Sequence, residues 1–234
     1  MAYDTILYDV RDAVAIVTMN RPEVRNAQNE EMKDELDIAF RTAESDDAVR
    51  VVVLKGAGRC FSAGHDLKQL PRDPGSFGAA LDRPWFEGNE EAFRQFTYKV
   101  LGHFLTLHYL RKPTIAQVHG PCPAAGWVLA TMCDLIVASD DTTFYDPVAR
   151  MATAGVEVLV EPWDLGIRKA KELMWTGDKI TAQEAQHLGM VNKVTTQSDL
   201  ERVTMGLANR IALTPPGAVQ TIKRSLNETL DLMG

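Results

Sequence analysis

A short, uninterrupted run of apolar residues, mostly valine, constrains the fold of this chain most. The run Val51–Leu54 is bounded by Gly56 and Gly58. A strand without polar alternation is typical of a parallel sheet that is buried on both faces. Further strands are predicted at Thr114–Val118 and Leu135–Ala138. Because predicted helices lie between these strands, we expect an α/β protein.

The N-terminal segment predicts a hairpin followed by a helix. Strands are expected at Thr5–Val10 and Ala13–Met19, with a turn at Arg11-Asp12. The helix has Asn29 as a plausible N-cap. Its apolar residues recur at spacings of three and four, namely Met32, Leu36, Ala39, Phe40 and Ala43.

The middle of the chain is less regular. A long loop is expected at residues 71–90, which are rich in proline and glycine. A helix is expected from about Phe93 to Leu107, because its apolar residues form one stripe that ends before Lys112-Pro113. Gly120–Pro123 is predicted to be a turn, and Ala124–Thr131 the start of a helix rich in small residues.

The last third of the sequence is predicted to be mostly helical. Capping boxes are expected at Thr181–Glu184 and Ser198–Glu201, with a short strand at Val191–Val194 between them. Amphipathic patterning predicts helices at Ile167–Trp175 and Pro216–Met233.

Composition excludes several functional classes. The chain has 25 Lys and Arg against 32 Asp and Glu, so its net charge is −7. An acidic chain without a long basic run is a poor candidate for nucleic-acid binding. No apolar stretch is long enough to span a bilayer and no secretory signal is visible, so we expect a cytoplasmic protein. The three cysteines are too scattered to predict a disulfide framework or a metal site.

Two turns rich in small residues follow two of the predicted strands. Phe61–Leu67 follows Val51–Leu54, and His119–Gly126 follows Thr114–Val118. Two such turns side by side could direct two backbone N–H groups at one oxygen atom and form an oxyanion hole. The residues alone favour another interpretation, in which small side chains allow two tight turns to pack closely.

Six motifs in order resemble one family. They are Asn20–Ala27, Phe61–Leu67, Met132–Asp134, Thr176–Asp178, Ala182–Ala185 and Leu188–Asn192. Together they resemble the crotonase superfamily, the enoyl-CoA hydratases and isomerases. The resemblance extends from about residue 3 to about residue 226.

The resemblance implies a fold, a ligand and an assembly. It implies a spiral of ββα units over residues 1–195, with an acyl-CoA site, and a helical trimerisation region over residues 196–234 that is short for the family. The expected ligand is an acyl-CoA substrate, with coenzyme A as part of the substrate and no tightly bound cofactor. The expected assembly is a homotrimer or a dimer of trimers.

The resemblance also assigns binding roles. The thioester carbonyl is expected to accept hydrogen bonds from the backbone N–H groups of His65 and of Ala125, with Gly126 beside it. Such donors stabilise charge that develops in a transition state. Arg21 is equally consistent with a contact to the CoA phosphates and with ordinary surface charge. The remaining residues expected near CoA are Arg25, Ala27, Ala63, Asp66, Leu67 and Lys68.

Two departures from the hydratase pattern concern acid/base chemistry. Val128 and Val148 stand where the resemblance places the two hydratase glutamates, and valine cannot transfer a proton. Glu157 is the first alternative acid/base candidate, although it is equally consistent with a solvent-facing loop carboxylate. Asp146 is a weaker candidate, and Glu161 is a further one.

His65 leaves the reaction open. The Ala-Gly-His-Asp turn resembles that of methylmalonyl-CoA decarboxylases, in which the imidazole would hold a carboxylate or donate a proton. The alternative is a space-filling side chain on a turn whose backbone does the work. A third hypothesis, of another class, is a non-catalytic CoA-binding or assembly subunit.

Overall fold

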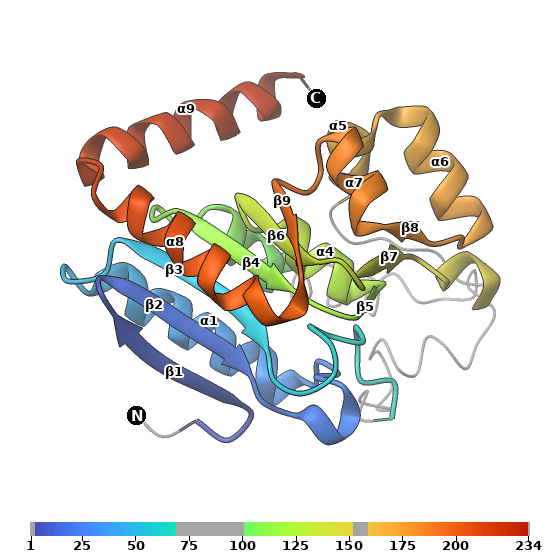
Figure 1. Ribbon diagram of the computed structural model, residues 1–234, viewed down its shortest axis with the longest axis horizontal. Coiled ribbons are helices and arrows are strands. Elements are labelled where there is room, and N and C mark those ends of the chain that lie inside the picture. The colour runs from blue at the N-terminus through green and yellow to red at the C-terminus, as the bar shows by residue number, and fades with distance from the viewer. Residues whose placement is uncertain (1–2, 69–100, 152–158, 234) are drawn as a thin grey trace, which may run out of the picture.

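The computed structural model describes residues 3–68, 101–151 and 159–233 (Figure 1). The main sheet has the strand order β1-β2-β3-β4-β6-β9, in which β1 is antiparallel to β2 and the later pairs are parallel. These strands are β1 (Ile6–Arg11), β2 (Val14–Met19), β3 (Val51–Gly56), β4 (Thr114–Val118), β6 (Leu135–Ser139) and β9 (Lys193–Thr195). A second, smaller sheet contains β5 (Pro121–Pro123), β7 (Thr143–Tyr145) and β8 (Ile180–Thr181).

Helices surround these sheets. They are α1 (Glu30–Ser45), α4 (Ala125–Thr131), α5 (Glu161–Leu165), α6 (Ile167–Thr176), α7 (Ala182–Leu188), α8 (Leu200–Ala212) and α9 (Pro216–Met233). The described residues also form short 3-10 helices, namely η1 (Pro22–Val24), η2 (Val148–Met151) and η3 (Gln197–Asp199). Residues 101–108 are also helical.

The main sheet is covered on both faces, as the apolar runs predict. Val14 and Ile16 of β2 pack in a cluster that includes Leu200 of α8. Ala15 and Val17, which alternate with them along the strand, belong to the opposite cluster, which includes Phe40 of α1. This division follows because successive side chains of a strand point to opposite faces. Figure 1 shows α1 and α8 on opposite sides of the sheet, and the α/β class is confirmed.

The first hairpin and helix follow the sequence closely. The β1–β2 register pairs Arg11 with Val14, so the turn residues are Asp12 and Ala13, one position later than predicted. Both have positive φ, 48° and 63°, which suits the right-handed twist of a two-residue hairpin. The predicted cap of α1 is confirmed, because the Asn29 side chain accepts a 3.0 Å bond from the N–H of Met32.

The prediction of a turn over all of Gly120–Pro123 is wrong. Gly120 has a positive φ of 63°, but Pro121–Pro123 forms β5 and pairs with Thr143–Tyr145. Prolines are tolerated here because β5 is an edge strand, where missing N–H donors break no ladder. The long loop predicted at 71–90 lies outside the described residues. The predicted helix that begins near Phe93 is described only from residue 101.

The two predicted capping boxes have different outcomes. At the start of α7, Thr181 Oγ1 accepts from the N–H of Glu184 while the Glu184 carboxylate accepts from the N–H of Thr181. The box predicted from Ser198 is wrong, because η3 occupies Gln197–Asp199 and α8 has no side-chain cap. Instead, the Asp199 carboxylate accepts from Arg202 at 3.0 Å.

Helix α9 is anchored through a partly buried ion pair. Lys223 Nζ lies 2.8 Å from Asp134 Oδ2, the same oxygen that accepts from the N–H of Thr114. Away from this anchor, α9 extends along one end of the molecule (Figure 1). The predicted boundary between residues 195 and 196 stays a prediction. Within the described ranges, no helix is long and apolar enough to cross a membrane.

Candidate active site

The two turns predicted to form an oxyanion hole lie in direct contact. A Cβ atom on Gly64 would lie 3.2 Å from the carbonyl oxygen of Pro123 and 3.3 Å from the backbone nitrogen of Ala125. In the other direction, a Cβ on Gly126 would lie 2.4 Å from the carbonyl oxygen of Ser62. Glycine at both positions therefore lets the backbones of the two turns approach each other closely.

Backbone pairing determines which way His65 presents its N–H group. His65 forms an isolated parallel bridge with Gln28. In this bridge the Gly64 oxygen accepts from the N–H of Gln28 at 2.8 Å, and the N–H of Asp66 donates to the Gln28 oxygen at 3.0 Å. Since neighbouring peptide groups alternate in direction along an extended chain, the N–H of His65 points away from Gln28.

The second turn supplies donors at the first residues of α4. Ala124 precedes the helix with φ 47°, and Ala125 and Gly126 are its first two residues. The first N–H groups of a helix have no acceptor within that helix. The contact between the two turns thus brings the backbone of His65 near the backbone donors of Ala125 and Gly126.

The His65 side chain lies beside an aromatic residue. It is half-buried, and its ring centroid is 6.4 Å from that of Phe104 at an interplanar angle of 54°. Phe104 is itself buried. The imidazole therefore occupies a partly apolar environment next to the paired turns.

The two valines of the predicted glutamate positions lie on different elements. Val128 is buried on α4, one turn after Ala125. Val148 begins η2 and is half-buried. Its N–H donates to Asp146 Oδ1 at 2.8 Å, so the buried carboxylate of Asp146 also positions the start of η2.

Asp146 and Glu161 line one cavity together with Val148. This cavity has a volume of about 380 Å³ and is also bounded by α6. Asp146 and Glu161 are only 6% and 1% exposed, so both carboxyl groups are largely shielded from water. The structure brings together two of the predicted acid/base candidates, whereas the first candidate, Glu157, lies outside the described residues.

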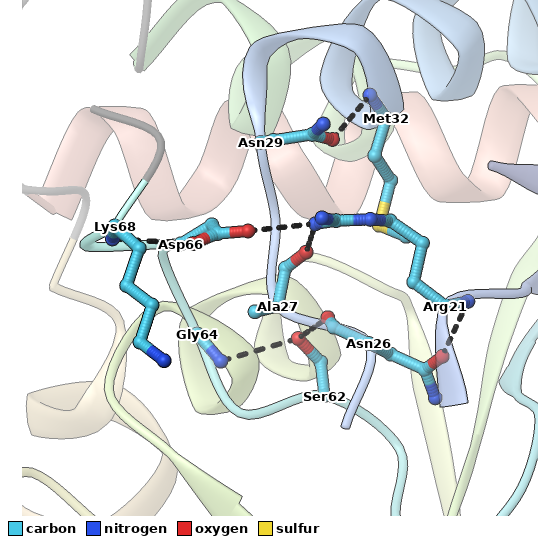
Figure 2. Close-up of polar contacts among 9 residues, drawn as sticks. All are labelled: Arg21, Asn26, Ala27, Asn29, Met32, Ser62, Gly64, Asp66 and Lys68. Carbon is cyan, nitrogen blue, oxygen red and sulfur yellow. Dashed lines mark hydrogen bonds and ion pairs between the residues drawn. The ribbon is translucent and has the colours of Figure 1, made fainter. Parts of the chain in front are cut away.

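The segments predicted to contact CoA are held together by a polar network (Figure 2). Arg21 Nη1 donates to the Ala27 oxygen at 2.6 Å and to Asp66 Oδ2 at 2.9 Å. Both side chains are mostly buried, with 11% and 8% exposure. Arg21 and Asp66 therefore form an internal clamp between the two segments.

The other predicted CoA residues line the outside of this clamp. Arg25, Leu67 and Lys68 are exposed, and Ala27 and Ala63 are half-buried. The Arg25 oxygen accepts from the N–H of Ala63 at 2.9 Å. Figure 2 shows the Lys68 side chain extending away from the Arg21–Asp66 pair. The cationic groups of Arg25 and Lys68 are thus available at the surface of these paired segments.

Gln28 and Ser62 belong to the site, although neither of them was assigned a role from the sequence. Gln28 Nε2 donates to Ser62 Oγ and to the Ala125 oxygen, each at 3.1 Å. Ser62 Oγ donates to the Asn26 oxygen and accepts from the N–H of Gly64 (Figure 2). The sequence signals for this role are weak: Gln28 directly follows the motif Asn20–Ala27, and Ser62 lies inside the motif Phe61–Leu67.

A further cavity of about 760 Å³ lies under α9. Apolar side chains line most of it, including Trp163 of α5 and Leu226 of α9. Burial raises the pKa of Asp164, which also lines this cavity, to about 6. In the part of the chain that the structure describes, no cluster of His, Cys, Asp and Glu could hold a metal ion.

Comparisons with known proteins agree with these observations. Residues 9–234 match the family model described as enoyl-CoA hydratase/isomerase. A Mycobacterium tuberculosis protein named as an enoyl-CoA hydratase, EchA13, is 46% identical over 99% of this chain and 76% of its own length. The crystal structure of a protein titled as a probable enoyl-CoA hydratase from Mycobacterium smegmatis has a TM-score of 0.86 and 42% identity, covering all of this chain and 88% of that one.

Another relative carries a different reaction in its name. An Arthrobacter protein named 4-chlorobenzoyl coenzyme A dehalogenase-2 is 30% identical over 93% of this chain and 75% of its own length. The names of these similar proteins therefore all refer to CoA thioesters, but they refer to different reactions.

Proposed function

This chain belongs to the enoyl-CoA hydratase/isomerase family, and we propose that it binds an acyl-CoA thioester and stabilises negative charge on the thioester oxygen. The proposed donors are the backbone N–H groups of His65 and of Ala125 or Gly126. Donors that are already oriented stabilise an enolate or tetrahedral oxyanion without reorganising during the reaction.

One observation supports this proposal above the others. The turn that contains Gly64 packs directly against the backbone nitrogen of Ala125, although the two turns are far apart in sequence. The approach is closer than a Cβ atom at Gly126 would permit. Such close packing supports a site in which backbone donors from both turns bind one oxygen atom of the substrate.

The exposed cations would hold the nucleotide end of CoA. Arg25 and Lys68 supply positive charge at the rim of the paired segments, in a protein whose net charge is −7. Phosphate groups favour such local cations. The backbone of Ala27, Ala63, Asp66 and Leu67 would then lie along the adenine and pantetheine groups.

Acid/base chemistry would come from carboxylates other than the usual glutamates. Asp146 and Glu161 line the same cavity as Val148, and a carboxyl group in such a position can transfer a proton to or from a bound substrate. Glu157 remains a prediction from the sequence. Replacing Asp146, Glu161 and Glu157 singly by Asn or Gln would show which of them the turnover requires.

Decarboxylation is a second candidate, supported by the position of His65 at the paired turns. In that reaction the C–C bond to the carboxylate breaks, CO₂ leaves, and the electron pair becomes an enolate held by the backbone donors. A proton then adds to the α-carbon. Turnover of methylmalonyl-CoA that is lost in His65→Ala would support it, because this variant keeps the backbone N–H. Unchanged turnover would exclude a catalytic imidazole.

Isothermal titration with crotonyl-CoA tests the general proposal. We expect saturable binding that weakens in Lys68→Met and is unchanged in Lys169→Met, a control at a lysine of α6 paired with Glu172. The absence of binding by crotonyl-, dienoyl- and malonyl-type thioesters would refute the proposal. Binding without turnover of any of them would favour the non-catalytic CoA-binding or assembly subunit.

The proposed assembly is a homotrimer or a dimer of trimers. Ile222 and Leu226 of α9 are 59% and 61% exposed in the single chain. An exposed row of large apolar side chains favours an interface with another chain. Light scattering coupled to size-exclusion chromatography would measure the mass, and a monomer at micromolar concentration would contradict the proposal.

A further inference from the structure

One buried side chain connects the two turns of the candidate site directly. Gln28 is 2% exposed, and its Nε2 atom lies 3.1 Å from Ser62 Oγ in the first turn and 3.1 Å from the Ala125 oxygen in the second. A carbonyl oxygen can only accept, so the Gln28 amide must present its NH₂ group to Ala125. Its two N–H donors are then both used, one for each turn.

The backbone of Gln28 reinforces the first of these contacts. Its N–H donates to the Gly64 oxygen at 2.8 Å, and its own oxygen accepts from the N–H of Asp66 at 3.0 Å. These two bonds involve the residues directly before and after His65, which itself pairs with Gln28. Gln28 thus holds the peptide groups on both sides of the proposed first donor while its side chain reaches the second turn.

The bond to the Ala125 oxygen bears on one of the two N–H groups proposed for the second turn, that of Gly126. The carbonyl of Ala125 and the N–H of Gly126 belong to one planar peptide group. A hydrogen bond that fixes the direction of this carbonyl therefore also fixes the direction of the Gly126 N–H. It further polarises the peptide group, which strengthens that N–H as a donor.

Ser62 completes the connection on the side of the first turn. Its hydroxyl accepts from the N–H of Gly64 as well as from Gln28, and donates to the Asn26 oxygen. Its hydrogen-bonding capacity is thereby filled. A shift of the Gln28 amide would disturb both Gly64 and Ala125, which are in contact where the two turns meet.

We propose that Gln28 is a positioning residue that keeps the backbone donors of the two turns aimed at one thioester oxygen. This inference rests on the proposed acyl-CoA function. It differs from a purely structural role because it predicts weaker polarisation of the bound carbonyl in a protein that still folds and still binds the thioester.

The test uses cinnamoyl-CoA, whose conjugated thioester absorbs at longer wavelength when its carbonyl oxygen accepts strong hydrogen bonds. The test variants are Gln28→Met, which keeps the length without donors, and Gln28→Asn, which keeps an amide that is one methylene too short. Gln183→Met is the matched control, because Gln183 Nε2 bonds an exposed backbone oxygen of Asp140 at 3.3 Å. Circular dichroism and thermal melting establish which variants fold.

We expect a smaller red shift in both Gln28 variants at saturating cinnamoyl-CoA, with the wild-type shift in Gln183→Met. With a thioester that the wild type turns over, kcat should fall about tenfold or more while KM changes less than about threefold. If Gln28→Met does not fold, the same measurements on Gln28→Asn decide.

Two negative results are distinguishable. If the wild-type protein binds neither cinnamoyl-CoA nor any of the crotonyl-, dienoyl- and malonyl-type thioesters, the proposed acyl-CoA function fails. If the wild type red-shifts the probe and a folded Gln28 variant gives the same shift and the same kcat, the positioning role of Gln28 is overturned.

Discussion

Substituting Gly126 by alanine would force the two turns of the candidate site apart. Gly126 is the second residue of α4, and an added Cβ would lie 2.4 Å from the Ser62 oxygen and 3.3 Å from Ser62 Cβ. Ordinary contact begins at 3.4 Å. The neighbouring atom is backbone, so no side-chain rotation can relieve the overlap. The first turn, the start of α4, or both must move by about 1 Å in total.

The expected magnitudes follow from that displacement. Overpacking a close-packed site costs about 1–3 kcal/mol of the free energy of unfolding. A misplacement of about 1 Å in a catalytic arrangement costs about 100-fold in rate. The functional loss should therefore exceed the loss of stability, since the protein can keep its fold while the donors diverge.

Gly206→Ala is the matched control for this substitution. Gly206 lies in α8, and a Cβ there would meet no atom within 4 Å. Alanine should raise the free energy of unfolding by about 0.5–1 kcal/mol because of its higher helix propensity. Urea denaturation measures both variants, and titration with cinnamoyl-CoA measures binding and carbonyl polarisation. A Gly126→Ala protein with the wild-type red shift and turnover would refute the assigned donor geometry.

Three further predictions concern stability. Arg21→Met should lower the free energy of unfolding by about 3–5 kcal/mol, because it leaves the mostly buried Asp66 carboxylate without its cation; a loss in urea denaturation below about 1 kcal/mol would contradict the buried-clamp interpretation. Thr181→Ala should cost about 1 kcal/mol through loss of the α7 capping box, and an unchanged urea midpoint would count against it. Burial raises the pKa of Asp164 from 3.8 to about 6, so the folded protein binds a proton at this carboxyl group more tightly than the unfolded chain does. The free energy of unfolding should therefore fall as the pH rises from about 4 to about 6 and this carboxyl group ionises. Asp164→Asn should therefore be more stable than the wild type at pH 8, by about 1–3 kcal/mol, and equal to it near pH 3; a pH-independent difference would contradict this origin.

Features encoded within a few residues were predictable. The cap of α1 at Asn29, the capping box at Thr181 and the buried run at Val51–Leu54 depend on neighbours in sequence, and the structure confirms each. The capping box predicted from Ser198 is absent because α8 begins at Leu200, one residue later than that box requires. The Asp199 carboxylate instead accepts a hydrogen bond from Arg202. Local patterns therefore predict an element more reliably than they predict which polar groups satisfy its ends.

Long-range pairing accounts for the strand that was missed. Pro121–Pro123 contains the residues that most favour a turn, yet it forms β5 because Thr143–Tyr145 supplies a partner strand. A strand of this length has no stability by itself and depends on the neighbour that pairs with it. The sequence of Pro121–Pro123 alone does not indicate that Thr143–Tyr145 will pair with it.

The features of the candidate site also differ in how far they could be predicted from the sequence. The α/β class, the two turns rich in small residues and, through its motifs, the family could be predicted from the sequence. The sequence does not indicate that Gly64 lies against Ala125, that Asp146 and Glu161 share a cavity, or that the Gln28 amide bonds to Ala125 across 97 positions of the chain. The difference lies in how far apart the interacting residues are along the chain. Helix caps and apolar runs act between residues that are close in sequence, whereas the direction of a backbone donor depends on contacts that exist only after the sheet and its crossovers have formed.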